Sequence, residues 1–202
     1  MARGRFITLE GGEGVGKSTQ ARRLADTLKA QGRTVLLTRE PGGTPGAEAI
    51  RALLVSGDAD RWDGWAEALL LNAARADHVR RAIEPALARG DWVVCDRFVD
   101  STLVYQGLAR GLGTERLVQL HDWAVGLWPD RTLVLTMDSQ AALTRARGVA
   151  PAEQRFESEG TDFHARLALG FAQLADAFPE RCRIVRAEGD PDTVTARLLA
   201  AL

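Results

Sequence analysis

A glycine-rich stretch near the amino terminus has the composition of a phosphate-binding loop. Residues 11–18 read GGEGVGKS and fit the pattern G-x-x-x-x-G-K-[ST]. Glycines let backbone N–H groups close around an anion, Lys17 can reach the β- and γ-phosphates, and the Ser18 hydroxyl can bind Mg²⁺. We predict a nucleoside triphosphate site made by Gly11, Gly12, Glu13, Gly14, Val15, Gly16, Lys17, Ser18 and Thr19.

The alternative for this stretch is a glycine turn that only joins a strand to a helix. Lys17 and Lys29 are the only lysines in the chain. The alternative does not explain why one of them lies at the motif position where a phosphate-binding loop needs it.

An acidic and a basic residue follow the third apolar run of the chain. Residues 93–95 lead directly into Asp96 and Arg97. An acidic residue at the end of a neighbouring strand can hold the hydration shell of Mg²⁺, so Ser18 and Asp96 are the predicted metal ligands. A helix cap or a surface ion pair is the alternative role for Asp96. The planar Arg97 guanidinium can bridge donor and acceptor phosphoryl groups.

Short apolar runs alternate with helical patterns along the whole chain, which predicts a parallel sheet with helices on both faces. The fold class is therefore α/β with three layers. Glycine or proline ends each predicted helix. The predicted strands are 6–9, 34–37, 92–95, 133–135 and 184–185, and the predicted helices are 18–30, 66–89, 114–127 and 163–178.

Length and charge exclude several classes of protein. The 202 residues suit a single domain, and the net charge of −1 gives no general basic field for nucleic acid or for a membrane surface. No apolar run approaches the ~18 residues that span a bilayer. Cys95 and Cys182 lie in apolar runs without metal-type spacing, so we expect buried free thiols and a cytoplasmic location.

Two polar segments and several scattered residues complete the pattern. Residues 39–46 form a predicted loop at the carboxyl end of a strand, and residues 147–155 form a predicted lid. Apolar residues in helix 114–127 face either the core or a dimer partner. The histidines lack metal-type clustering and are expected on helix surfaces, and the tryptophans in the core or an interface; these are His78, His121, His164, Trp62, Trp65, Trp92, Trp123 and Trp128.

Four segments together resemble the bacterial thymidylate kinases. They are residues 11–18, 38–44, 70–75 and 96–107, in the same order over essentially the whole chain. The resemblance implies the phosphate-loop fold of nucleoside monophosphate kinases, with a five-stranded parallel sheet and a short lid at about 147–157. It also implies Mg²⁺-dependent transfer of the γ-phosphoryl group of ATP to dTMP, giving dTDP for dTTP synthesis, by a homodimer.

The resemblance implies roles for individual side chains around the acceptor. Glu13 lies near the sugar 3′-hydroxyl, Arg51 and Arg97 hold the dTMP phosphate, and Arg75 contacts the thymine. Glu40 and Pro41 line the pocket, Thr102 and Gln106 lie near the base, and Tyr105 lies beside the sugar. The predicted acceptor site is Glu13, Glu40, Pro41, Arg51, Leu71, Arg75, Arg97, Thr102, Tyr105 and Gln106.

The chain departs from its apparent relatives at two places. Many of them carry a phenylalanine that stacks on the thymine where this chain has Leu71. The lid arginines are spaced about one residue further apart than in some relatives, so either Arg147 or Arg155 can be the one that reaches the phosphates. Because Gly14 adds no positive charge to the loop, both lid arginines are predicted catalytic residues with Lys17, Asp96 and Arg97.

Three other classes of function fit the sequence less well. A nucleotide-switch GTPase needs an N-K-x-D motif, which a chain with only Lys17 and Lys29 lacks. Another small-molecule kinase shares the phosphate loop but should lack the segment 96–106 as it stands. A non-catalytic ATP-binding regulator would not need Asp96, Arg97 and the lid arginines.

Overall fold

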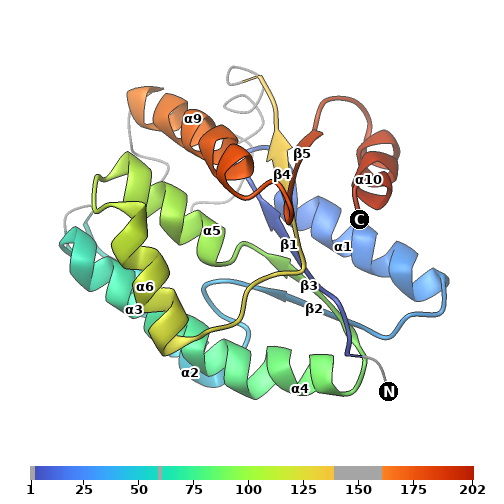
Figure 1. Cartoon of the computed structure of the whole chain (residues 1–202), viewed down its shortest axis with the longest axis horizontal. Helices are drawn as coiled ribbons and strands as arrows, with labels where there is room; N and C mark the ends of the chain where they lie inside the picture. The colour runs from blue at the N-terminus through green and yellow to red at the C-terminus, as the bar shows by residue number, and fades with distance from the viewer. Residues whose placement is uncertain (1–2, 59–60, 139–160) are drawn as a thin grey trace.

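The computed structural model describes residues 3–58, 61–138 and 161–202, and these build a parallel five-stranded sheet between two layers of helices (Figure 1). The strand order is β2-β3-β1-β4-β5. The strands are β1 (Phe6–Glu10), β2 (Val35–Arg39), β3 (Trp92–Asp96), β4 (Arg131–Thr136) and β5 (Cys182–Arg186). This arrangement confirms the predicted fold class, whereas the predicted lid lies outside the described residues.

Successive side chains of the central strands enter different hydrophobic cores, because side chains alternate between the two faces of a sheet. On β1, Phe6 packs into one core and Ile7 and Leu9 pack into the other. On β3, Val93 and Val94 divide in the same way. Burial on both faces explains why these strands are continuous apolar runs.

The helices divide between the two faces. Helices α1 and α10 contact each other and contribute Leu24 and Leu198 to one core. Helices α4 and α9 contribute residues such as Leu87 and Phe171 to the core on the other face of the sheet. The helical segments are α1 (Lys17–Ala30), α2 (Pro45–Val55), α3 (Gly64–His78), η1 (Val79–Ile83), α4 (Glu84–Ala88), α5 (Val99–Thr102), η2 (Leu103–Ala109), α6 (Thr114–Ala124), α9 (Thr161–Ala177) and α10 (Pro191–Ala200).

Three helical segments were missed by the sequence prediction. Thr44, placed in the predicted loop, accepts a hydrogen bond from the Ala47 N–H and begins α2. Asp190 begins α10 in the same way by accepting from Thr193. In both helices proline follows the capping residue, a start signal that does not depend on periodicity. The third segment consists of α5 followed by η2. Both η2 and the separate segment η1, which follows α3, have π-helical geometry.

Two histidines, His78 and His121, are not on the surface, contrary to the sequence prediction. His78 and His121 are both 0% exposed. His121 is hydrogen-bonded through Nε2 to the Leu127 carbonyl at 2.9 Å. Burial lowers the pKa of His121 to about 4, and the nearby Arg75 charge acts in the same direction. His121 is therefore neutral in the folded protein at neutral pH.

We expect His121 to make folding stability depend on pH. Its pKa is lower in the folded chain than in the unfolded chain, so the unfolded state binds a proton first as the pH falls below about 6.5. Relative to His121→Gln, which cannot titrate, the wild type should lose up to about 3 kcal/mol of unfolding free energy between pH 7 and pH 4. Denaturant unfolding of both proteins at several pH values measures this difference.

The comparison between the two proteins separates His121 from other titrating groups. Burial raises the pKa of Glu10 to about 7, which gives the opposite dependence on pH, but Glu10 is present in both proteins. Parallel stability curves for the wild type and His121→Gln would show that His121 carries no such effect.

Two further sequence predictions concern the thiols and the membrane. Cys95 and Cys182 are free and buried, as predicted. Across the described ranges, none of the helices combines the length and the apolar character that crossing a membrane requires.

Candidate active site

The phosphate-binding loop joins β1 to α1 at the carboxyl edge of the sheet. Gly11 has a φ of +134°, and a Cβ there would lie 2.3 Å from the Leu135 carbonyl oxygen, so the close approach of β4 requires glycine. Gly16 is left-handed with a φ of +92° and directly precedes the first residue of α1, Lys17. The amino terminus of the 14-residue helix α1 therefore points into the concave side of the loop.

Asp96 lies beside this loop because β1 and β3 are neighbours, with Leu9 in register with Asp96. The Ser18 hydroxyl donates a hydrogen bond to Asp96 Oδ2. Within the described residues, the buried Asp96 Oδ1 accepts no hydrogen bond. A hydroxyl and a carboxylate with a spare oxygen are ligands that Mg²⁺ accepts, so these two residues fit the metal predicted from the sequence.

A cavity of about 740 Å³ lies over the loop. The predicted residues Glu13 to Thr19 line it, whereas Gly11 and Gly12 are not among its lining residues. The cavity continues to the segment after β5, which the sequence analysis did not assign to the site. This side is lined by Ala187, Gly189, Pro191 and Val194.

Lys17 lies against the loop at the floor of this cavity. Its ammonium donates a hydrogen bond to the Gly12 carbonyl, and the residue is 7% exposed. Burial lowers the pKa of Lys17 to about 8; the Arg97 charge acts in the same direction, and Asp96 and Glu13 oppose them. A bound polyphosphate would replace the carbonyl as the partner of this charge.

Arg97 lies between the two halves of the site. Its guanidinium donates to Ser101 Oγ at 3.1 Å, lies 3.8 Å from Glu13 Oε1 and stacks over the Tyr105 ring at 5.1 Å. Burial acts to lower the pKa of Arg97, but interactions with Tyr105 and Asp96 outweigh it and raise the pKa, so the guanidinium stays charged. Arg97 also has a φ of +67°, a left-handed conformation that is uncommon outside glycine.

A second, mostly apolar pocket contains the whole predicted acceptor set. Its ten predicted side chains come from the loop, the segments after β2 and β3, and the helical segments α2, α3, α5 and η2. Glu13, Glu40, Arg51 and Arg97 line this pocket and also the larger cavity. The residues that line it are Glu13, Glu40, Pro41, Arg51, Val55, Leu71, Arg75, Arg97, Phe98, Ser101, Thr102, Tyr105 and Gln106.

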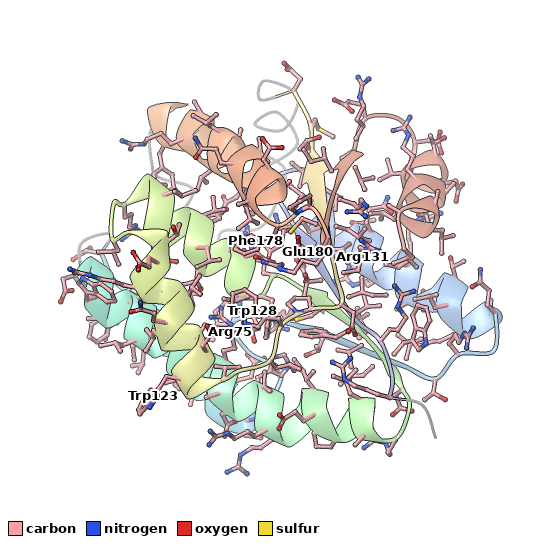
Figure 2. The ribbon with its side chains drawn as sticks, in the orientation of Figure 1. Arg75, Trp123, Trp128, Arg131, Phe178 and Glu180 are labelled. Atoms are coloured by element: carbon pink, nitrogen blue, oxygen red, sulfur yellow. The ribbon has the colours of Figure 1, made fainter. Side chains whose placement is uncertain are left out.

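Arg75 is a buried cation held on one side only. Its Nε donates to Glu40 Oε2 at 2.7 Å and its Nη2 to Thr102 Oγ1 at 3.0 Å. Nη1 is buried without a hydrogen-bond partner in the part of the chain that the structure describes. The residue is 2% exposed and lies in the interior of the molecule (Figure 2). A buried N–H without an acceptor is costly, so this pocket is suited to a ligand that brings one.

Three buried side chains form hydrogen bonds to residues in and beside the two cavities. They were not assigned to the site from the sequence. His78 is hydrogen-bonded to Thr38 at 2.8 Å and to Glu40 at 3.1 Å. Glu10 accepts from the Phe98 N–H at 2.8 Å and from the Ser101 hydroxyl at 2.6 Å. Glu67 accepts from Gln106 at 2.7 Å. Of these, Glu10 had a usable signal, because it is the last residue of β1 before the glycine loop.

Two predicted residues cannot be placed. Arg147 and Arg155 lie in 139–160, outside the described residues. No group of three or more histidine, cysteine, aspartate or glutamate side chains able to hold a metal ion is found among the residues that are described. A metal held by Ser18, Asp96 and phosphate oxygens does not need such a cluster.

Comparison with known proteins gives the same family throughout. The family model of thymidylate kinase matches residues 9–198. Thymidylate kinase of Rhizorhabdus wittichii is 56% identical over 201 residues, covering 98% of this chain and 97% of the relative. Thymidylate kinase of Caulobacter vibrioides is 50% identical over 199 residues, covering 98% and 95%.

A solved structure agrees with these relatives. The crystal structure of thymidylate kinase from Ehrlichia chaffeensis matches with a TM-score of 0.79 and 30% identity, covering 98% of each chain. The matches span nearly the whole sequence, including the phosphate loop and the segments that line both cavities. The chain therefore belongs to the thymidylate kinase family.

Proposed function

We propose that this chain transfers the γ-phosphoryl group of ATP to dTMP, giving dTDP for the synthesis of dTTP. Family membership supports the reaction. The observation that carries the site assignment is the acceptor pocket, which contains all ten predicted acceptor residues and shares four of them with the cavity over the phosphate loop. A donor and an acceptor bound in these cavities would meet at the shared residues, of which Arg97 is the central cation.

Within this proposal each group has a defined task. Backbone N–H groups of the loop and Lys17 bind the donor phosphates, Arg51 and Arg97 hold the acceptor phosphate, and Arg75 offers Nη1 to the base. Ser18 and Asp96 would hold Mg²⁺, which neutralises phosphate charge when bound. No side chain becomes phosphorylated, because positioned phosphates can react in line with electrostatic help alone.

An ADP-release assay with a panel of nucleoside monophosphates tests the reaction. We expect release of ADP that requires dTMP and Mg²⁺, with no burst of ADP in the absence of an acceptor. Preference for another monophosphate would contradict the proposed substrate. A trapped phosphoenzyme would contradict direct transfer.

We expect Leu71→Phe to keep activity and to tighten dTMP binding by up to about tenfold. Leu71 and Arg75 are four residues apart on α3, and both line the acceptor pocket. Leucine gives the base an apolar wall, and an aromatic ring in its place would add roughly 0.5–1.5 kcal/mol of oriented stacking beyond its buried area. Calorimetric titration of dTMP into both proteins measures the change.

The control for this substitution is Arg75→Ala in the same titration. It should weaken dTMP binding, because the base would lose its charged donor. Unchanged affinity in both Leu71→Phe and Arg75→Ala would remove this face of α3 from the acceptor site.

The assembly, the lid and the location are also part of the proposal. We propose a homodimer, which the family resemblance and large exposed apolar side chains support; Leu69 is 54% exposed on α3, and Trp123 is 86% exposed and projects from α6 (Figure 2). Light scattering in solution tests this assembly.

We also propose that one of Arg147 and Arg155 supplies charge from a lid. The two free thiols support a cytoplasmic location.

A further inference from the structure

One buried carboxylate at the acceptor pocket has no task in the proposed transfer. Glu67 lies in the first turn of α3 and is 0% exposed. It does not line the pocket, but its Oε1 accepts a hydrogen bond from Gln106 Nε2 at 2.7 Å, and Gln106 does line it. The Arg110 guanidinium lies 3.4 Å from the same carboxylate oxygen. A buried charged group is costly unless it is paired, so this arrangement needs a reason.

The contact decides which end of the Gln106 amide is available to a ligand. A glutamine side chain has a donating NH₂ group and an accepting carbonyl oxygen, and an ionised carboxylate can only accept. The NH₂ group of Gln106 must therefore face Glu67. With the NH₂ side held there, the carbonyl Oε1 on the other side of the amide is the acceptor that Gln106 can offer to the pocket.

The polar groups of the pocket wall then have fixed directions. Arg75 can only donate, and its Nη1 is buried without a hydrogen-bond partner in the described residues. Gln106 accepts, because Glu67 holds its NH₂ group. Thr102, which already accepts from Arg75, carries a hydroxyl that rotates and so discriminates less. The wall therefore offers a ligand a donor from Arg75 and an acceptor from Gln106.

We propose that Glu67 is a positioning residue for base selection: it orients the Gln106 amide so that the pocket accepts a base with an N–H donor next to a carbonyl oxygen and disfavours the aminopyrimidine pattern. Thymine has this imide edge. In 5-methylcytosine, the ring nitrogen is a bare acceptor and the neighbouring group is an amine. These two bases have nearly the same shape, so the distinction rests on hydrogen-bond polarity. The inference rests on the proposed acceptor site.

Paired substitutions of Glu67 separate this role from packing. Glu67→Met fills a similar volume but cannot accept, so the Gln106 amide is free to turn. The ratio of kcat/KM for dTMP to that for 5-methyl-dCMP should fall by at least about tenfold. Glu67→Gln keeps an oxygen that can accept from both Gln106 and Arg110, and it should hold the ratio within about threefold of the wild type. Glu115→Met, an exposed residue in the first turn of α6, is the matched control.

A second variant tests whether Glu67 acts through Gln106. Gln106→Met removes the amide, so it should lower the same ratio, and adding Glu67→Met to it should cause no further fall. An unchanged ratio in folded Glu67→Met would overturn the proposal. It would also be overturned if Glu67→Met lowered the ratio as much in the Gln106→Met protein as it does in the wild type. If Glu67→Met does not fold, an unchanged ratio in Gln106→Met overturns it instead. Wild type that fails to phosphorylate dTMP would contradict the proposed function itself, which is a separate outcome.

Discussion

Lys17→Ala should lower kcat by about 10²- to 10³-fold, the range typical for removing one positioned charge or donor from a reacting centre. Lys17 lines the cavity over the phosphate-binding loop, and its ammonium is held by the Gly12 carbonyl. Negative charge shifts toward the β–γ bridging oxygen as the phosphoryl group leaves, so the interaction strengthens in the transition state. Steady-state kinetics with saturating ATP and dTMP measure the loss.

The other lysine provides a matched control. Lys29 also lies on α1, but it is exposed and pairs with Asp26 at 3.8 Å on the surface. Lys29→Ala should leave kcat unchanged. Because burial disfavours the charged form of Lys17, its removal should not lower the melting temperature. A kcat within a few-fold of the wild type in Lys17→Ala would remove Lys17 from the catalytic residues.

Arg97→Ala should lower kcat/KM for dTMP by about 10²- to 10⁴-fold, which corresponds to roughly 3–5 kcal/mol at 1.36 kcal/mol per tenfold. The guanidinium lines both cavities, and its neighbours Glu13, Ser101 and Tyr105 fix its position. Its removal would leave Arg51 as the one remaining arginine assigned to the acceptor phosphate, so both KM for dTMP and kcat should be affected.

Two variants define what Arg97 contributes. Arg97→Lys keeps a charge but loses the planar fork, so its activity should lie between those of Arg97→Ala and the wild type. Arg89→Ala removes an arginine whose ion pair with Asp91 lies near the surface, and it should have no effect on kcat/KM. Equal kcat/KM values for dTMP in the wild type and Arg97→Ala would make Arg97 a structural ion-pair residue only.

The donor half of the site was predictable from the sequence because its parts are local. The glycine loop, Lys17 and Ser18 are contiguous, and the loop geometry depends on glycines at fixed spacing. The position of Asp96 beside the loop was predictable for a different reason, because the carboxyl ends of parallel strands meet at one edge of a sheet. Alternation of apolar runs with helical patterns was enough to predict the parallel sheet, since the strands are buried on both faces.

The acceptor half was predicted only through the family resemblance, and its internal contacts needed the tertiary structure. Arg75 and Glu40 are 35 positions apart, and Glu67 and Gln106 are 39 apart. A polar residue on a helix gives no local sign that it will be buried, so His78 was expected on a surface, whereas it is buried and hydrogen-bonded to Thr38 and Glu40.

The sequence by itself therefore determined the glycine loop to which we assign the donor phosphates, because backbone conformation and residue type at neighbouring positions create that loop. Which side of the Gln106 amide or the Arg75 guanidinium faces the pocket was decided only by the packing of α3 against η2 and against the segment after β2. A polar side chain in a pocket takes its direction from the partner that already occupies its other atoms. That partner, Glu40 for Arg75 and Glu67 for Gln106, comes from a distant part of the sequence.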